Sequence, residues 1–592
     1  MGHESRAAKR THLSLWLFAR NCRFALWMLL VLLTAIIVLF PVHLTYEYRS
    51  VQSLHIFDNL LLFGALFYIW LLSLLLLLFS GGSEARTDWE KVALVCISSL
   101  VFLAFWVIIL PYGRFDYMSN ATLVKLIQRD GAIPLGRALY SDFPASHLMV
   151  LSVSQVTGLG IFDAVNLFLV CNALIFAALL YLLFSKAFKS TSVAAFAALM
   201  LMLGNQFLSR GYTFWPGILS LVLLLAFLVL LSRGQHRFLE TWQDRLIGII
   251  LLVATTAMYF QASILILLIL VGIHLMQRLS KMTPVAISTI CLFAVIPIAW
   301  EIYWTVQTFP GLADRASKMA EDIAGGTFLH SAPFLAGGNV GERFPLWVSV
   351  IRIYWWALIF GLGSLLGLRN LSRFRELSLV ERVELGGLLG VIMLAAIGTL
   401  VSVGGERFVH FLHYAAFFTV PVLLRTSLNL GKRIKGYGFA LLVILLLLLS
   451  FPTFLVFNNK ICTDTFYSYE MAGSEFLERS YGNGEGLTVV NPYVPVTYYV
   501  PDVHPEMGYW YVGAARNEDE FWQTVDAVAG AYSIPRAGHT LFMVHDRLKV
   551  TGEFVLGISP TDPHWQGIED EISARLMDTS LIYDNGYVQT YK

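Results

Sequence analysis

The chain has 592 residues, of which 57% are hydrophobic and only 14% are charged, and its formal net charge is +1. A soluble domain has about 25% charged residues, so this composition excludes a soluble globular protein, a disordered chain and a disulfide-stapled secreted module. The balanced charge also argues against a nucleic-acid partner. An aromatic share of 14% is typical of a protein with many membrane spans, in which aromatic side chains pack between helices and at the interfaces.

Apolar segments of about 20 residues recur along the chain and predict a polytopic α-helical membrane protein with about thirteen transmembrane helices. The basic N-terminus precedes the first apolar segment without a small-residue cleavage site, so we expect a retained span and not a signal peptide. The stretch 246–278 fits either one bent pair of helices or a differently placed turn. The expected spans are 24–44, 57–80, 92–112, 164–186, 191–208, 214–232, 246–262, 263–278, 284–306, 345–367, 385–403, 407–424 and 437–457.

Charge is distributed unequally along the chain and between the loops. Residues 1–457 have a net charge of +12, whereas residues 458–592 have a net charge of −11. Arg and Lys concentrate in alternate loops, which are cytoplasmic if the N-terminus is cytoplasmic, as the positive-inside rule requires. The sequence thus predicts a transmembrane domain, 1–457, and an extracytoplasmic domain, 458–592.

The predicted orientation leaves two long loops on the extracytoplasmic side, residues 113–163 and 308–344. We call residues 113–163 the first loop. Within it, the apolar stretch from His147 to Leu159 is too short to span, so we expect a re-entrant or interfacial helix there.

The pattern of residues 458–592 is typical of a small α/β domain. Thr488 to Val500 is rich in β-forming residues, but Pro492 and Pro495 interrupt it, which predicts an edge strand or two short strands. A structural or substrate-capping role is favoured over catalysis, because no nucleotide-binding, zinc-protease or nucleophile-elbow motif is present. We further expect a strand at Thr540–His545, a hairpin at Leu581–Tyr591 around Asn585-Gly586, and helices at about 466–479, 518–532 and 566–577.

The first loop has the most informative pattern of the chain. It begins after a span that ends near Pro111. In order, it contains Asp116, a helical segment Tyr117–Arg129, the turn Gly131-Ala-Ile-Pro134, the element Tyr140-Ser-Asp-Phe-Pro144, and the apolar helix from His147 to Val156-Thr-Gly158-Leu-Gly160.

This order resembles the first extracytoplasmic loop of the GT-C superfamily of membrane glycosyltransferases. The resemblance is closest to enzymes that use dolichyl- or polyprenyl-phosphate sugars, including protein O-mannosyltransferase-like and aminoarabinose transferase-like members. It covers residues 92–232 in order, and the later spans and the tail agree in layout. Two features depart from the pattern. Tyr117 stands where many members have a second acid, and Arg210-Gly-Tyr-Thr-Phe-Trp-Pro216 lacks the acid that many members have there.

The resemblance implies an inverting glycosyltransferase that moves a sugar from a polyprenyl-phosphate-linked donor to an acceptor glycan, lipid or protein. An inverting transfer needs a general base for the acceptor and no enzyme nucleophile, and Asp116 is the candidate for that base. Partial desolvation at the membrane surface would raise the pKa of its carboxyl toward a useful range. The alternative is that Asp116 is a solvated loop acid or caps the following helix.

The leaving phosphate needs cationic partners or a divalent metal ion such as Mg or Mn. Asp142 and Glu301 are candidates for an assisting or metal-binding role. The candidates for donor-phosphate binding are Arg114, Arg137, Arg210, Arg352, Arg407, His410 and His147.

Several of these candidates also have a structural interpretation. Asp142 fits a turn or cap, Glu301 and Arg352 fit an ion pair within the spans, and Arg407 fits an interfacial anchor. His147 fits a residue that caps or orients its own helix. The sequon at Asn120 is interpreted as coincidental, because it lies so close to the membrane.

Two other functions remain open. An O-antigen polymerase or ligase would use the loop 308–344, with Arg315, His330 and Arg343. A transporter or flippase of a lipid-linked saccharide would show internal repeats and charges at the membrane midplane. No such repeat is visible, and the ionisable residues of the spans lie near their outer ends, which favours the enzyme.

Overall fold

The computed structural model describes the helical body of the chain and much of its C-terminal part. The described residues are 23–37, 60–79, 84–109, 115–134, 143–203, 214, 216–233, 239, 241–304, 361–369, 371–401, 405–433, 468–482, 487–490, 494–499, 504–506, 522–523, 525–527, 539–545, 562–577, 581–584 and 588–592.

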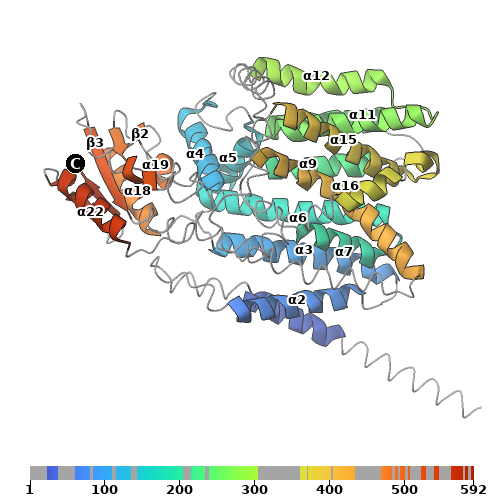
Figure 1. Ribbon diagram of the computed structural model, residues 1–592, viewed down its shortest axis with the longest axis horizontal. Helices are drawn as coiled ribbons and strands as arrows, with labels where there is room; N and C mark the ends of the chain where they lie inside the picture. The colour runs from blue at the N-terminus through green and yellow to red at the C-terminus, as the bar shows by residue number, and fades with distance from the viewer. Residues whose placement is uncertain are drawn as a thin grey trace, which may run out of the picture.

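Long apolar helices run side by side and form the body of the molecule, with the C-terminal sheet at one end (Figure 1). They follow the predicted spans. In an apolar environment a helix is favoured, because it satisfies its backbone hydrogen bonds within the segment. Besides the helix Arg23–Ile37, they are α2 (Leu60–Phe79), α3 (Glu84–Ile109), α6 (Ile161–Ala187), α7 (Thr191–Met202), α9 (Pro216–Leu231), α10 (Trp242–Met258), α11 (Phe260–Leu279), α12 (Ile287–Trp304), α15 (Leu379–Val401) and α16 (Gly405–Arg433).

Among the described residues, Ile161–Ala187 and Gln261–Leu279 are long and apolar enough to cross a membrane by length and composition alone. Of the expected span 345–367 only its last residues are described, within the helix 361–369, and 437–457 lies outside the described residues. The count of thirteen therefore stays a prediction.

The stretch 246–278 is a pair of helices that meet at Tyr259. Its backbone is extended there, with φ −165° and ψ 115°, which ends α10 and begins α11. At the other end of α10, the Thr241 hydroxyl accepts a hydrogen bond from the Asp244 N–H at 3.1 Å and caps the helix. Both helices contact α9. The stretch is therefore two helices, and the turn between them lies at Tyr259 instead of between residues 262 and 263, where the expected spans divide.

Glycines bring the backbones of α11 and α15 into direct contact. A Cβ added to Gly272 would lie 2.7 Å from the carbonyl oxygen of Gly386, and one on Gly390 would lie 2.9 Å from the backbone nitrogen of Ile269. Small residues at such positions allow membrane helices to approach closely and gain van der Waals contact.

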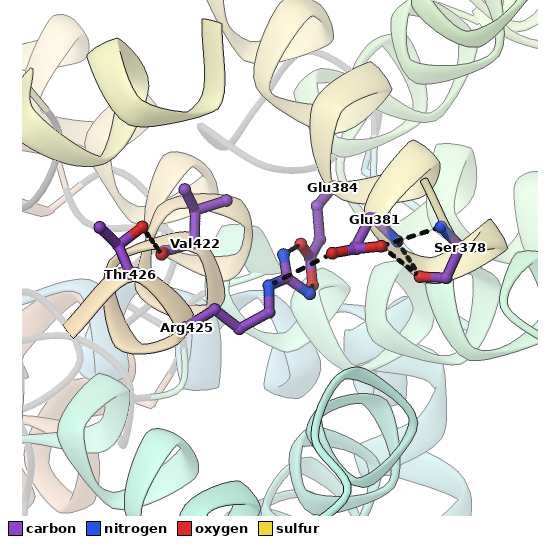
Figure 2. Close-up of polar contacts among 6 residues, drawn as sticks. All are labelled: Ser378, Glu381, Glu384, Val422, Arg425 and Thr426. Atoms are coloured by element: carbon purple, nitrogen blue, oxygen red, sulfur yellow. Dashed lines mark hydrogen bonds and ion pairs between the residues drawn. The ribbon is translucent and has the colours of Figure 1, made fainter. Parts of the chain in front are cut away.

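A buried ion pair joins α15 to α16. Figure 2 shows Arg425 of α16 directed at Glu384 and Glu381 of α15. The Arg425 Nη1 is 3.3 Å from Glu384 Oε1, a second contact joins Nη2 to Oε2, and Nε is 3.8 Å from Glu381 Oε1. Glu381 also accepts from the Ser378 N–H at 2.8 Å while its own N–H faces the Ser378 hydroxyl at 3.4 Å, a capping box that begins α15.

The C-terminal part contains a five-stranded mixed sheet in the order β2-β1-β3-β5-β4. β1 pairs in parallel with β2 and β3, and β5 pairs antiparallel with β3 and β4. The expected α/β architecture, the strand at 540–545 and the hairpin are confirmed. The elements are α18 (Ser468–Tyr481), β1 (Leu487–Val490), α19 (Val494–Tyr499), β2 (His504–Glu506), β3 (His539–His545), α22 (Pro563–Leu576), β4 (Leu581–Asp584) and β5 (Val588–Tyr591).

The prediction for Thr488 to Val500 is wrong in two respects. Among the described residues of this stretch, the strand is Leu487–Val490, and it lies between two neighbours in the sheet instead of at its edge. Residues 494–499 form the helix α19. Pro495 does not prevent this helix, because the first N–H groups of a helix have no intrahelical partner and their loss costs nothing. The expected helices at 466–479 and 566–577 are confirmed as α18 and α22, and within 518–532 the described residues 522–523 and 525–527 are helical.

Candidate active site

Two short helices form the described part of the first loop. They are α4 (Phe115–Asp130) and α5 (Ala145–Thr157), as the sequence predicts. Asp116 lies in the first turn of α4. Free backbone N–H groups and the helix dipole stabilise a negative charge at that end of a helix. The side chain of Asp116 lies outside the described residues, so its role as base stays a prediction.

Tyr117 anchors the first turn of α4 to α6. Its ring stacks on Phe162, with centroids 6.0 Å apart and planes at 6°. Its hydroxyl lies 3.0 Å from Asn166 Oδ1, to which it donates, and 3.3 Å from the Phe162 carbonyl oxygen. Burial, with nearby Tyr498 and Asp163, raises the pKa of this hydroxyl far above its ordinary value. Tyr117 is therefore a fixed neutral donor beside Asp116.

His147 ties α5 to α4. The Asn120 amide nitrogen donates to the Phe214 carbonyl at 3.0 Å, which leaves the amide oxygen 2.8 Å from His147 Nε2. Both side chains are buried, and burial lowers the pKa of His147 to about 4. This geometry favours the interpretation that His147 orients its helix. The buried Asn120 amide likewise agrees with a coincidental sequon, whereas phosphate binding by His147 stays a prediction.

Exposed apolar side chains of α5 lie beside exposed polar ones, Ser152, Gln155 and Thr157. Leu148, Met149 and Val156 are 40%, 49% and 86% exposed, whereas Val150 and Leu151 are buried. The helix ends at Gly158, whose φ of +72° is the left-handed conformation that favours glycine at a helix C-terminus. At 13 residues α5 is too short to span a bilayer. A short helix that exposes both apolar and polar side chains fits an interfacial position, and the interfacial or re-entrant placement stays a prediction.

The structure describes the other candidates only in part. Glu301 lies in the last turn of α12, and Arg407 and His410 lie one turn apart near the start of α16, but their side chains are outside the described residues. Among the described residues, no group of three His, Cys, Asp or Glu side chains is placed to hold a metal ion. Wholly outside the described residues are Arg114, Arg137, Asp142, Arg210, Arg352, Arg315, His330 and Arg343.

The C-terminal part of the chain contacts the first loop, which the sequence did not predict. Lys125 of α4 lies 2.7 Å from the Glu478 carboxylate of α18, and Tyr498 of α19 packs against Phe162. The ion pair joins residues 353 positions apart in the chain, and no local pattern marks such a pair. In the sequence, the feature that could have indicated this contact is the adjacent pair Tyr498-Tyr499. It follows Pro492 and Pro495, which separate it from β1.

Comparison with known proteins supports the fold. No protein-family model matches the chain, and no curated protein matches it in sequence. Among solved structures, the oligosaccharyltransferase of Archaeoglobus fulgidus in its apo form is similar, with a TM-score of 0.50 and 12% identity over 80% of this chain and 72% of that chain. The same values hold for AglB of that organism in complex with an inhibitory peptide and a dolichol-phosphate.

A third similar structure is ArnT from Cupriavidus metallidurans bound to undecaprenyl phosphate. It has 12% identity over 86% of this chain and 98% of that chain, with a TM-score of 0.38. The two archaeal structures, which are GT-C membrane glycosyltransferases, share their fold with this chain over 80% of its length. The resemblance that the first loop indicated is confirmed at the level of the fold.

Proposed function

We propose that the chain is an inverting glycosyltransferase that moves a sugar from a polyprenyl-phosphate-linked donor to an acceptor on the extracytoplasmic face. The observation that supports this most is the similarity in fold, over 80% of the chain, to an oligosaccharyltransferase solved with a dolichol-phosphate. The order of Asp116, α4 and α5 in the first loop agrees with it.

In the proposed reaction, Asp116 accepts the proton of the acceptor hydroxyl or amide as that atom attacks the anomeric carbon of the donor. The bond from this carbon to the phosphate oxygen breaks, and its electron pair leaves with the polyprenyl phosphate. Attack from the face opposite the phosphate inverts the configuration. Among the cationic candidates, Arg210, Arg352, Arg407 and His410 would neutralise the charge that develops on the phosphate.

The test is a transfer assay in lipid vesicles with the purified full-length chain. The assay offers radiolabelled polyprenyl-phosphate sugars and measures the release of polyprenyl phosphate. We expect Asp116→Asn to lower kcat by about 10²- to 10⁴-fold, because the base is lost. Asp163→Asn is the matched control, since Asp163 is an exposed carboxylate in the first turn of the neighbouring helix α6. Full activity of Asp116→Asn would refute the proposed base.

The same variants separate the alternative functions. A polymerase or ligase would keep activity in Asp116→Asn and lose it in Arg343→Ala. A transporter would move labelled lipid-linked saccharide across vesicles even when Asp116 is replaced. Either outcome would replace the proposed function.

A further inference from the structure

The C-terminal domain holds α4 through one lysine. The ammonium of Lys125 lies 2.7 Å from Glu478 Oε1 and 3.5 Å from the Tyr499 carbonyl oxygen. It also lies 4.8 Å from the ring centroid of Tyr498 and 5.4 Å from that of Tyr499. A carboxylate, a carbonyl and two aromatic faces of the C-terminal domain therefore surround one cation of the first loop. We call this contact the Lys125 clamp.

A second contact reaches the first turn of α4. Tyr498 is only 8% exposed and belongs to the hydrophobic core of the helical body. Its ring centroid lies 4.6 Å from that of Phe162, which stacks in turn on Tyr117. Tyr117 directly follows Asp116 in the chain. The C-terminal domain thus packs, through one intervening ring, on the residue beside the proposed base.

Together the two contacts restrain the orientation of α4. Tyr117 and Lys125 are separated by eight residues, or about 12 Å along the helix axis. A helix held at two such points cannot tilt about either one alone. On the other side, the Tyr499 hydroxyl donates to Glu475 Oε1 at 3.2 Å, which fixes α19 on α18. The restraint therefore runs from α18 through α19 to both ends of this segment of α4.

We propose that the C-terminal domain positions the catalytic loop, with Lys125, Glu478 and Tyr498 as positioning residues for the transfer. This inference rests on the proposed function. A small displacement of a catalytic group costs a large factor in rate, even when the cause lies far from the reacting atoms. The ion pair is partly exposed, at 25% and 39%, and such pairs contribute little to global stability. The clamp can therefore be removed without unfolding the chain.

The experiment compares Lys125→Met, Glu478→Gln and the double variant of the full-length protein in the vesicle assay. We expect each to lower kcat about 10-fold with the KM for the donor unchanged, because the base moves while the donor site stays intact. The double variant should be no slower than either single variant, because both break the same contact. Lys125→Arg should restore activity, since a guanidinium keeps the charge and stacks on aromatic rings.

Matched controls come from the C-terminal domain. Tyr498→Phe keeps the ring that contacts Phe162 and should retain activity, whereas Tyr498→Ala should lose it. Glu571→Gln removes a partly exposed ion pair with Arg575 within α22, apart from the contacts of α18 and α19 with α4, and should change nothing. A loss of activity in Glu571→Gln equal to that in Glu478→Gln would overturn the proposal.

Hydrogen exchange gives a readout that does not depend on turnover. In Lys125→Met we expect the amides of 115–125 to exchange about 10-fold faster, while those of α11 and α15 are unchanged. Unchanged kcat and unchanged exchange, or a rise in exchange across the whole chain, would overturn the proposal. Full activity in Asp116→Asn would refute the proposed base and, with it, the reason for the fall in kcat, whereas the exchange of the α4 amides tests the contact itself, whichever residue accepts the proton.

Discussion

Of the ion pairs that join helices among the described residues, the α15–α16 contact and the Lys125 clamp differ in how deeply their side chains are buried. In the α15–α16 contact, Glu384 is 6% exposed and Arg425 is 21% exposed; in the Lys125 clamp, the two side chains are 25% and 39% exposed. Removing one partner of a buried pair leaves a charge without compensation, whereas an exposed partner is simply hydrated. The first pair therefore contributes to the stability of the fold, whereas the second can fix the position of α4 without contributing much stability.

A substitution at Arg425 tests the stabilising role of the α15–α16 pair most directly. We expect Arg425→Met to lower the free energy of unfolding by about 3–5 kcal/mol, because it leaves Glu384 buried without its partner. Chemical denaturation in detergent micelles measures this. The double variant Arg425→Met, Glu384→Leu should recover most of the loss, since no buried charge remains. A loss in Arg425→Met as small as that in Lys125→Met would contradict the comparison.

His147 makes one part of the stability of the chain depend on pH. Burial lowers its pKa from 6.5 to about 4 in the folded chain, so between these values only the unfolded chain takes up the proton. The resulting stability is complete above pH 6.5 and is lost as the pH falls toward 4, by about 3 kcal/mol in all. Denaturation curves between pH 4 and pH 7.5 check this against His147→Gln, which should lack this part of the dependence. Parallel curves for the two proteins would show the expectation to be wrong.

The close packing of α15 against α11 can be tested by a substitution that changes no charge. We expect Gly390→Ala to lower the free energy of unfolding by about 1–3 kcal/mol, because the added Cβ meets the backbone of α11. Gly361→Ala is the matched control, since a Cβ there meets nothing within 4 Å. The same denaturation experiment compares the two variants, and equal stability would mean that the helices separate at little cost.

The smallest change in stability is expected at the Lys125 clamp. Lys125→Met should change the free energy of unfolding by less than about 1 kcal/mol, although we expect kcat to fall. Denaturation under the conditions used for Arg425→Met gives the value. A loss equal to that of Arg425→Met would make the clamp a structural contact like the α15–α16 pair.

Local patterns predicted the helices, α4 and α5, and the hairpin, because apolar runs, helix ends and turn residues are encoded within a few positions. They failed at residues 494–499, where a proline that is harmless in a first helical turn was interpreted as an interruption of a strand. The Lys125 clamp was beyond reach for a different reason. Its partners come from α4 and α18, and only the packed fold brings them together. The helix expected at Tyr117–Arg129 begins two residues earlier, at Phe115, so Asp116 lies within its first turn and does not precede it.

The distance along the chain between Lys125 and Glu478 has a consequence for biosynthesis. The ribosome makes α4 long before α18, because 353 positions separate the two residues. Until then the first loop has no partner for its lysine, however completely the intervening helices have inserted. On our proposal, a nascent chain acquires a correctly oriented base only when the C-terminal domain has folded against α4. Chains that stall before this domain is made would therefore be inactive, so sugar transfer would begin only after synthesis has passed α18.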